Sequence, residues 1–331
     1  MIAPVAVALG DPAGIGSEIT AKAYAETNAR ALPCFFAVGS LRALKSAWLG
    51  PVEIIQTPDQ AIEVCGNALP LIEVEHDEEI RFGEPSLEGA RCALDSLELA
   101  TGLVKSGAAS ALVTAPVSKA QLAAVGFTHP GQTEFVAERC GVAQQNVAMM
   151  LVGPSLKCVP VTMHIGLADV PAALTTELIV SRIMATARGL IRNFGIARPR
   201  IAVAGLNPHA GESGLMGTEE RTLILPAIEA LAGEEFDLLG PLPADTMFHA
   251  HARQYFDAAV CMYHDQALIP VKTLHFDEGV NLTLGLPIVR TSPDHGTAFD
   301  IAGKNLARPD AMVAALNMAA SCAERRALYE A

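Results

Sequence analysis

Short apolar runs alternate with amphipathic stretches along almost the whole chain of 331 residues. The apolar runs have the length of buried strands and predict strands at 4–9, 33–38, 111–115, 147–152, 158–163, 201–206 and 258–263. The amphipathic stretches predict helices at 86–106, 176–195, 217–232 and about 310–328. This alternation is typical of an α/β protein with a mostly parallel sheet and helices on both faces.

The rhythm changes near the end of the chain. Residues 268–291 predict an antiparallel ribbon that turns around 277–279. No linker separates two halves of the sequence, so two lobes would share the sheet or exchange segments of chain.

Three histidines, His164, His209 and His264, each stand where a predicted strand gives way to a loop. In α/β proteins this edge of the sheet is where ligands bind. The histidines are 45 and 55 residues apart, too far for a zinc finger, so only the fold could bring them together. Three imidazoles so assembled would form a metal site with open coordination positions. The alternative is that they are unrelated and satisfy local hydrogen bonds.

Composition narrows the class of protein. The net charge of −13 argues against a nucleic-acid partner. The seven cysteines are an odd number without a C-x-x-C motif, which suits a reducing cytoplasm. The first apolar run leads into Asp11 without a basic region, which indicates a strand rather than a signal peptide, and no stretch has membrane-spanning character. We therefore expect a cytoplasmic protein that binds neither nucleic acid nor membrane.

Two glycine-containing segments are candidates for binding a dinucleotide. The first has glycines at Gly10, Gly14 and Gly16, a spacing that differs from the G-x-G-x-x-G of a Rossmann fold, so we reject that interpretation. The second, 295–304, is rich in small residues that allow a ligand to approach the backbone. An ordinary loop before the last helix would have the same composition.

The second segment resembles the H-G-S-A-P-D-I-A-G loop of isopropylmalate and isocitrate dehydrogenases, since it has the sequence H-G-T-A-F-D-I-A-G. In those enzymes the loop holds the adenosine end of NAD without a Rossmann fold. The resemblance implies an NAD or NADP site here. Its expected contacts are His295, Gly296, Asp300 and Gly303.

Further motifs along the chain resemble the 4-hydroxythreonine-4-phosphate dehydrogenase family of vitamin B6 biosynthesis. They are G-D-P-A-G-I-G-S-E at 10–18, T-A-P-V-S-K at 114–119, P-G-Q-T-E at 130–134, G-L-N-P-H-A-G-E at 205–212, G-P-L-P-A-D-T at 240–246, M-Y-H-D-Q at 262–266 and G-V-N-L-T-L-G-L-P-I-V-R-T-S-P-D-H-G-T-A at 279–298. The resemblance implies a two-lobed α/β/α fold of isocitrate/isopropylmalate dehydrogenase type, with the active site in the cleft between the lobes. Residues 1–130 with 280–331 would form one lobe, and 131–279 would form the other.

The resemblance also implies the site residues. The family's metal ligands fall on His164, His209 and His264 and would hold zinc, magnesium or cobalt, with the third histidine supplied by the partner in a homodimer. The family's substrate contacts fall on Gln132, Thr133, Asp245, Lys272, Asn281 and Arg290. Gln132 departs from the family pattern, which usually has histidine in G-H-T-E. Glutamine can still donate a hydrogen bond to an oxyanion but cannot carry a charge.

The implied reaction is the oxidation of 4-phosphohydroxy-L-threonine to 2-amino-3-oxo-4-phosphooxybutanoate by NAD. Decarboxylation then gives 3-amino-2-oxopropyl phosphate. An alternative is the same chemistry on another hydroxy acid, such as a 4-phosphothreonate or a dihydrodiol carboxylate. A protein of a different class, an acyl-phosphate transfer protein on a related fold, would need neither the three histidines nor the 295–304 loop.

Overall fold

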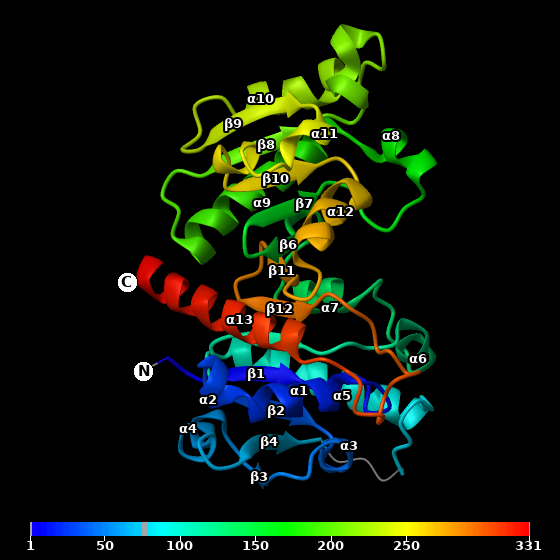
Figure 1. Ribbon diagram of the computed structural model, residues 1–331, viewed down its shortest axis with the longest axis vertical. Coiled ribbons are helices and arrows are strands. Elements are labelled where there is room, and N and C mark those ends of the chain that lie inside the picture. Colours follow the sequence, from blue (N-terminus) through cyan, green and yellow to red (C-terminus); the bar gives the residue numbers. More distant parts are fainter. Residues whose placement is uncertain (1, 75–78, 331) are drawn as a thin grey trace. The chain divides into compact units, whose positions relative to one another are not determined.

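The structure, a computed structural model, describes residues 2–74 and 79–330 and divides into two compact units (Figure 1). The first unit comprises Met1–Gly141 and Leu286–Glu324, and the second comprises Val142–Gly285 and Arg325–Ala331. Each unit combines strands and helices, which confirms the α/β class predicted from the alternating pattern.

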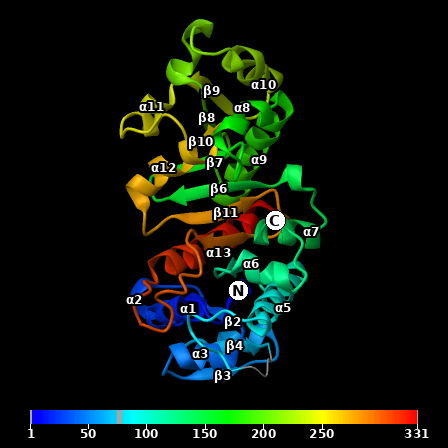
Figure 2. The same cartoon turned by 90° about the vertical axis from the view of Figure 1, so that its right-hand side faces the viewer.

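The first unit is built on parallel strands in the order β3-β4-β2-β1-β5-β12. These strands are β1 (Val5–Ala8), β2 (Phe35–Gly39), β3 (Val52–Ile54), β4 (Leu69–Glu73), β5 (Leu112–Thr114) and β12 (Arg290–Pro293). The helices are α1 (Gly16–Ala25), α2 (Thr27–Arg30), α3 (Leu41–Ala47), α4 (Ala61–Val64), α5 (Leu87–Lys105), α6 (Lys119–Ala124), α7 (Gln132–Arg139) and most of α13 (Asp310–Tyr329). Figure 2 shows α1 and α3 on one side of the strands and α5 on the other.

The second unit has the strand order β11-β6-β7-β10-β8-β9. Its strands are β6 (Ala148–Gly153), β7 (Leu156–Pro160), β8 (Arg200–Ala204), β9 (Asp237–Leu242), β10 (Ala258–Cys261) and β11 (Val280–Leu284). Pairing is parallel among β7, β10, β8 and β9, whereas β6 is antiparallel to both β7 and β11. The helices are α8 (Val170–Ala173), α9 (Thr176–Phe194), α10 (Leu225–Ala230), α11 (Ala244–Met247) and α12 (His264–His275).

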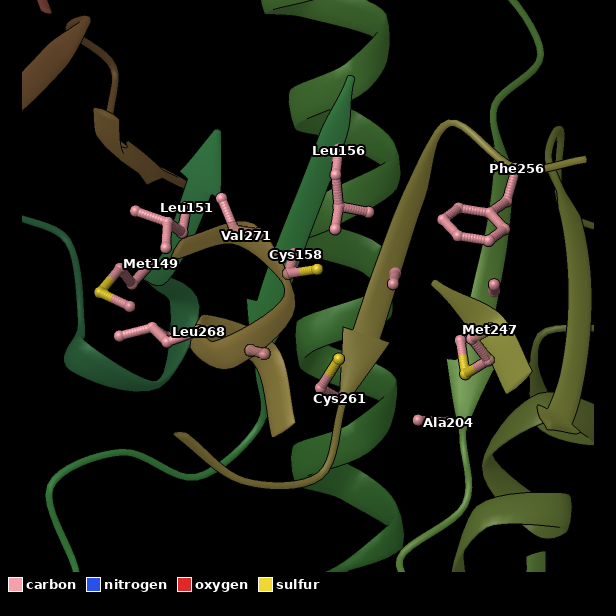
Figure 3. Packing of buried hydrophobic residues seen from close by; sticks show 13 residues of the cluster. Met149, Leu151, Leu156, Cys158, Ala204, Met247, Phe256, Cys261, Leu268 and Val271 are labelled. Atoms are coloured by element: carbon pink, nitrogen blue, oxygen red, sulfur yellow. The ribbon is translucent and has the colours of Figure 1, made fainter. Parts of the chain in front are cut away.

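Helix α12 covers one face of these strands, and α9 covers the other (Figure 3). On the α12 face, Leu268 and Val271 pack into a buried cluster with Leu156, Cys158 and Cys261 of the strands (Figure 3). Burying an aliphatic side chain stabilises a fold by roughly 1.5–3 kcal/mol. This packing holds α12, and the histidine at its first position, against the sheet.

All seven strands predicted from apolar runs are present, with ends shifted by a few residues. Helices α5, α9 and α13 confirm three of the predicted helices. Helix α9 begins after Thr175, whose side chain accepts a hydrogen bond from the backbone N–H of Leu178, and ends at Gly195 in the left-handed conformation, so its bounds agree with the predicted range of 176–195.

The predicted helix at 217–232 is two elements instead of one. A π-helical turn, Glu220–Ile224, precedes α10. Pro226 lies at the start of α10 and lacks the N–H that a continuous α-helix would need there. The break therefore follows from the proline, and it places Glu220 at the start of an irregular turn.

The antiparallel ribbon predicted at 268–291 is wrong. Residues 264–275 form α12, and only β11 and β12 farther along are extended. The prediction failed because Pro270 argues against a helix interior and its apolar neighbours resemble a strand, whereas Ala267, Leu268 and Val271 have helical spacing and are buried on one face. Lys272 and His275, expected on the ribbon, lie in the last turn of α12.

Strands β3, β4 and β9 were not predicted. Strands β3 and β9 each lie at one end of their unit's strand order and have partly exposed residues, so they lack a long apolar run. Strand β4 contains Pro70. Among residues 2–74 and 79–330, no single helix has the length and apolar character to cross a membrane. One pair of helical segments, Leu167–Ala173 and Thr176–Phe194, is long and apolar enough when taken together, but it is bent by 95°.

Candidate functional site

Three neighbouring strands of the second unit lead into the three histidines. Strand β10 lies between β7 and β8 and is parallel to both, so the carboxyl ends of all three lie at one edge. His164 follows β7, His264 follows β10 and His209 follows β8. The topology thus directs all three residues to the edge where α/β proteins bind ligands.

The structure brings two of these side chains together. The ring centroids of His164 and His264 are 5.7 Å apart. Both line a cavity of about 320 Å³, together with Tyr263 and Leu167. The Nδ1 atom of His264 lies 2.7 Å from Oδ1 of Asp265. A carboxylate on one ring nitrogen orients an imidazole and directs its other nitrogen, here Nε2, toward a metal.

His209 lies in an unusual turn. Five consecutive residues, His209 to Ser213, have left-handed backbone angles, with φ between 43° and 81°. Only one of them, Gly211, is a glycine, and the left-handed conformation costs other residues roughly 1–2 kcal/mol each. Such strain persists where the surroundings impose it, and it is concentrated at functional sites.

A buried carboxylate holds this turn in place. Glu220 accepts hydrogen bonds from the backbone N–H of Asn207 (2.7 Å) and from Nδ2 of the same side chain (3.1 Å). A Cβ atom at Gly211 would lie 2.5 Å from Oε2 of Glu220, so glycine is required there. Within the described part of the chain, no group of three His, Cys, Asp or Glu side chains gathers closely enough to hold a metal ion. One copy of the chain therefore brings His164 to His264 but does not add His209 to that pair.

Arg290 is the centre of a second group of residues, in the first unit. It begins β12 and is only 3% exposed. Its guanidinium donates to Oγ1 of Thr114 (2.7 Å) and to Oγ1 of Thr133 (3.0 Å). Burial lowers the pKa of Arg290 to about 10, against a smaller opposing effect of Glu134. The group is still a cation at neutral pH, held at a fixed position in the interior.

Gln132 is the first residue of α7, next to Thr133. Its Nε2 donates a hydrogen bond to the carbonyl oxygen of Ala115, at 3.3 Å. The carboxamide has a second N–H, which is the donor that remains for an anion. Gln132 is therefore a neutral hydrogen-bond donor next to Thr133, which itself contacts the buried guanidinium of Arg290.

The other expected substrate residues lie in the second unit. Asn281 is on β11, and its Oδ1 is buried without a hydrogen-bond partner among the residues that the structure describes. Lys272 lies in the last turn of α12, and Asp245 is an exposed residue of α11. A buried acceptor without a partner is costly, so Asn281 is a credible contact for a ligand donor.

The loop expected to bind the cofactor packs on the first glycine turn. The backbone N–H of Ile15 donates to the carbonyl oxygen of Thr297, at 3.1 Å. Asp11 in this turn is buried, accepts a hydrogen bond from the N–H of Ala13 at 3.0 Å, and has a pKa that burial raises. Gly303 has a φ of 72° and lies against Phe82.

His295, Gly296 and Asp300 are exposed on this loop. The Nδ1 atom of His295 lies 3.2 Å from the carbonyl oxygen of Gly296. Beside the glycine turn is a cavity of about 410 Å³, lined by Pro12, Ala13 and the start of α5. The first unit therefore offers an open, partly polar cavity next to the turn on which the loop packs.

Comparison with known proteins identifies the family. A sequence model of the family described as "Pyridoxal phosphate biosynthetic protein PdxA" matches residues 31–319. The chain belongs to this family.

A relative from Zymomonas mobilis, named 4-hydroxythreonine-4-phosphate dehydrogenase, is 54% identical over 98% of this chain and 97% of its own. Solved structures of proteins with that name resemble the chain throughout. One from Burkholderia phymatum has 38% identity and a TM-score of 0.84, covering 97% of this chain and 98% of its own. One from Klebsiella pneumoniae has 36% identity and a TM-score of 0.87, covering 97% and 99%. The family resemblance inferred from the motifs is confirmed.

Several residues that build these groups were not singled out by the sequence. They are Thr114, Asn207 and Glu220, described above, and two residues near the histidines, Thr162 and Gln266. Thr162 donates to the carbonyl oxygen of Met262, and Gln266 donates to that of Gly205. All except Thr162 and Glu220 lie within motifs that carry the family resemblance. The motifs were therefore the available signal, but the partners of these side chains lie far away in the sequence.

Proposed function

We propose that this member of the PdxA family is an NAD(P)-dependent 4-hydroxythreonine-4-phosphate dehydrogenase. It oxidises the secondary alcohol of 4-phosphohydroxy-L-threonine to 2-amino-3-oxo-4-phosphooxybutanoate, which loses carbon dioxide to give 3-amino-2-oxopropyl phosphate. The observation that carries the proposal is the placement of imidazoles at three adjacent strand ends in a chain of this family. Other hydroxy acids are not favoured as substrates, because two curated relatives that are each 54% identical to this chain have the dehydrogenase name.

The donor set suits a divalent cation such as zinc, cobalt or magnesium. Imidazole nitrogens are ligands for such cations, and Asp265 orients the ring of His264. We propose that His164, His209 and His264 hold the cation, with His264 supplied by a second copy of the chain in a homodimer. When bound, the cation would lower the pKa of the substrate hydroxyl and stabilise negative charge during decarboxylation.

Arg290, Thr133 and Gln132 suit the phosphate of the substrate. Arg290 supplies a cation whose position Thr114 and Thr133 fix, and Gln132 supplies a neutral donor. We assign Lys272, Asn281 and Asp245 to the rest of the substrate, with the buried Oδ1 of Asn281 accepting from its ammonium or hydroxyl group. These groups would orient the hydroxyl and exclude water from it.

The loop at 295–304 would hold the nucleotide. His295 would stack on or bond to the adenine, and the carboxylate of Asp300 would accept hydrogen bonds from ribose hydroxyls. Gly296 and Gly303 allow the ligand to approach the backbone. NAD(P), when bound, accepts the hydride. We also place the enzyme in the cytoplasm, because its seven thiols are free and suit a reducing compartment.

The test is formation of NADH or NADPH by purified protein with 4-phosphohydroxy-L-threonine, before and after chelation. We expect activity to disappear on chelation and to return with zinc or cobalt. His209→Ala and His264→Ala proteins should each be inactive, and mixed subunits should recover part of the activity if the sites are shared. Full activity after complete metal removal would refute the metal-dependent mechanism, and mixed dimers without recovery would refute the shared site.

A further inference from the structure

Buried hydrogen bonds connect the three strand ends that lead to the histidines. Thr162, two residues before His164, donates from Oγ1 to the carbonyl oxygen of Met262, at 2.8 Å. The backbone N–H of Met262 in turn donates to Oε1 of Gln266, at 2.7 Å. Gln266 completes the connection, because its Nε2 donates to the carbonyl oxygen of Gly205 at 2.8 Å. One chain of bonds therefore runs from the end of β7, through β10, to the end of β8.

These bonds lie just beyond the regular strands. Strand β7 ends at Pro160, β10 at Cys261 and β8 at Ala204. Past these points, buried backbone groups still need partners. Thr162 and Gln266, which are 5% and 9% exposed, meet that need with side-chain atoms. Backbone bonds from Val161 to Cys261 (2.7 Å) and from Thr162 to Met262 (3.2 Å) continue the pairing of β7 with β10, and the hydroxyl of Thr162 adds a second bond to the carbonyl oxygen of Met262. The side chain of Gln266 then joins the end of β10 to the end of β8.

Gln266 suits this task because one carboxamide has both an acceptor and a donor. Its oxygen accepts from β10 and its nitrogen donates to β8. A carboxylate cannot donate to the carbonyl of Gly205, and an apolar side chain can make neither bond. Gln266 also lies two residues after His264 on the first turn of α12, so a shift of its side chain would move that turn.

We propose that Gln266 and Thr162 are positioning residues that set the geometry of the histidine-bearing strand ends, and so the affinity of the site for a divalent cation. This inference rests on the proposed metal-dependent function. Neither side chain contacts the cation in this scheme; each acts through the backbone that carries a histidine. Loss of residues that support metal ligands typically weakens metal affinity by about 10- to 100-fold.

The experiment is a titration of the metal-free, full-length protein with cobalt(II) alone, followed by the visible absorption of the bound ion. The variants are Gln266→Met, Thr162→Val and Thr162→Ser, with His164→Ala as the reference for a lost ligand. We expect affinity for cobalt to fall about 10- to 100-fold in Gln266→Met and Thr162→Val, with a changed absorption spectrum. Thr162→Ser keeps the hydroxyl and should restore both the affinity and the spectrum of the unmodified protein.

Thr186→Val is the matched control. Thr186 is a buried residue of α9, and its Oγ1 donates to the carbonyl oxygen of Arg182 at 2.7 Å. Like Thr162→Val, the Thr186→Val variant loses a hydrogen bond from a threonine hydroxyl to a carbonyl oxygen in the second unit, but away from the ends of β7, β10 and β8. We expect a lower melting temperature in this variant but unchanged cobalt binding, which separates positioning from general stability.

The outcomes distinguish the two proposals. Suppose that the unmodified protein gives a cobalt spectrum and that His164→Ala abolishes it. If Thr162→Val and Gln266→Met then bind cobalt as tightly as the unmodified protein, the positioning role is overturned and the metal site stands. If the unmodified protein shows no histidine-dependent cobalt spectrum, both proposals fail. Should Gln266→Met not fold, the comparison of Thr162→Val with Thr162→Ser decides the question alone.

Discussion

Replacement of Arg290 by methionine should separate stability from substrate binding. Arg290 is buried, and burial lowers its pKa from the ordinary value of a guanidinium to about 10. Because one pKa unit corresponds to about 1.4 kcal/mol, burying this charge costs about 3 kcal/mol relative to a solvated guanidinium. At neutral pH the group is protonated in both the folded and the unfolded chain. That cost is therefore fully present, and it declines only as the pH rises through about 10, where the folded-state group loses its proton.

Methionine would remove this cost while roughly filling the same space. The bonds to Thr114 and Thr133 would be lost, at about 1.5–3 kcal/mol for each bond to a charged group. The two lost bonds together cost about 3–6 kcal/mol and the removed burial cost returns about 3 kcal/mol, so we expect the free energy of unfolding to fall by no more than about 3 kcal/mol. By contrast, kcat/KM should fall by about 100-fold or more, because a charged contact to phosphate would be lost.

Urea unfolding gives the stability, and steady-state kinetics with 4-phosphohydroxy-L-threonine give kcat and KM. Arg198→Met is the control, since Arg198 is an exposed arginine paired with Asp237 at 2.8 Å. It should change neither the urea midpoint nor the kinetics measurably. The reasoning is refuted if Arg290→Met unfolds the protein, or if it retains the kcat/KM of the unmodified enzyme.

Two further predictions concern Gln132 and Glu220. In Gln132→His, KM for the substrate should fall as the pH drops through about 6.5, because a protonated imidazole would face the phosphate. The measurement compares the pH dependence of KM in this variant with that in the unmodified enzyme. Parallel profiles would exclude a contact between Gln132 and phosphate. In Glu220→Gln, an amide N–H₂ would meet the donors of Asn207, so the free energy of unfolding should fall by about 1–3 kcal/mol. Urea unfolding tests the second prediction, with exposed Glu229→Gln as control, and equal stability of the two variants would contradict it.

The sequence predicted the elements whose pattern is local. Apolar runs identified the buried strands, and the amphipathic pattern identified both ends of α9. The prediction failed at α12, where Pro270 argued against a helix although the buried residues have helical spacing. The edge strands β3 and β9 were missed because their exposed residues do not form an apolar run.

The candidate site was predictable only in part, for a related reason. The histidines could be found because each ends an apolar run. The roles of Thr162 and Gln266 could not be found, because their bonds join residues 100 and 61 positions apart in the chain. The left-handed turn around His209 was likewise hidden, since most of its residues are not glycine.

The proline inside α12 has a consequence for the order of folding. Pro270 has no N–H to offer to the carbonyl of Gln266, so the helix loses the bond that would tie its first turn to its second. That first turn, which includes His264, is attached instead to β10 and β8 through the side chain of Gln266. It cannot be completed until those two strands lie beside each other. If the proposed metal site is correct, the capacity to bind a cation is a property of the assembled sheet rather than of the helix itself.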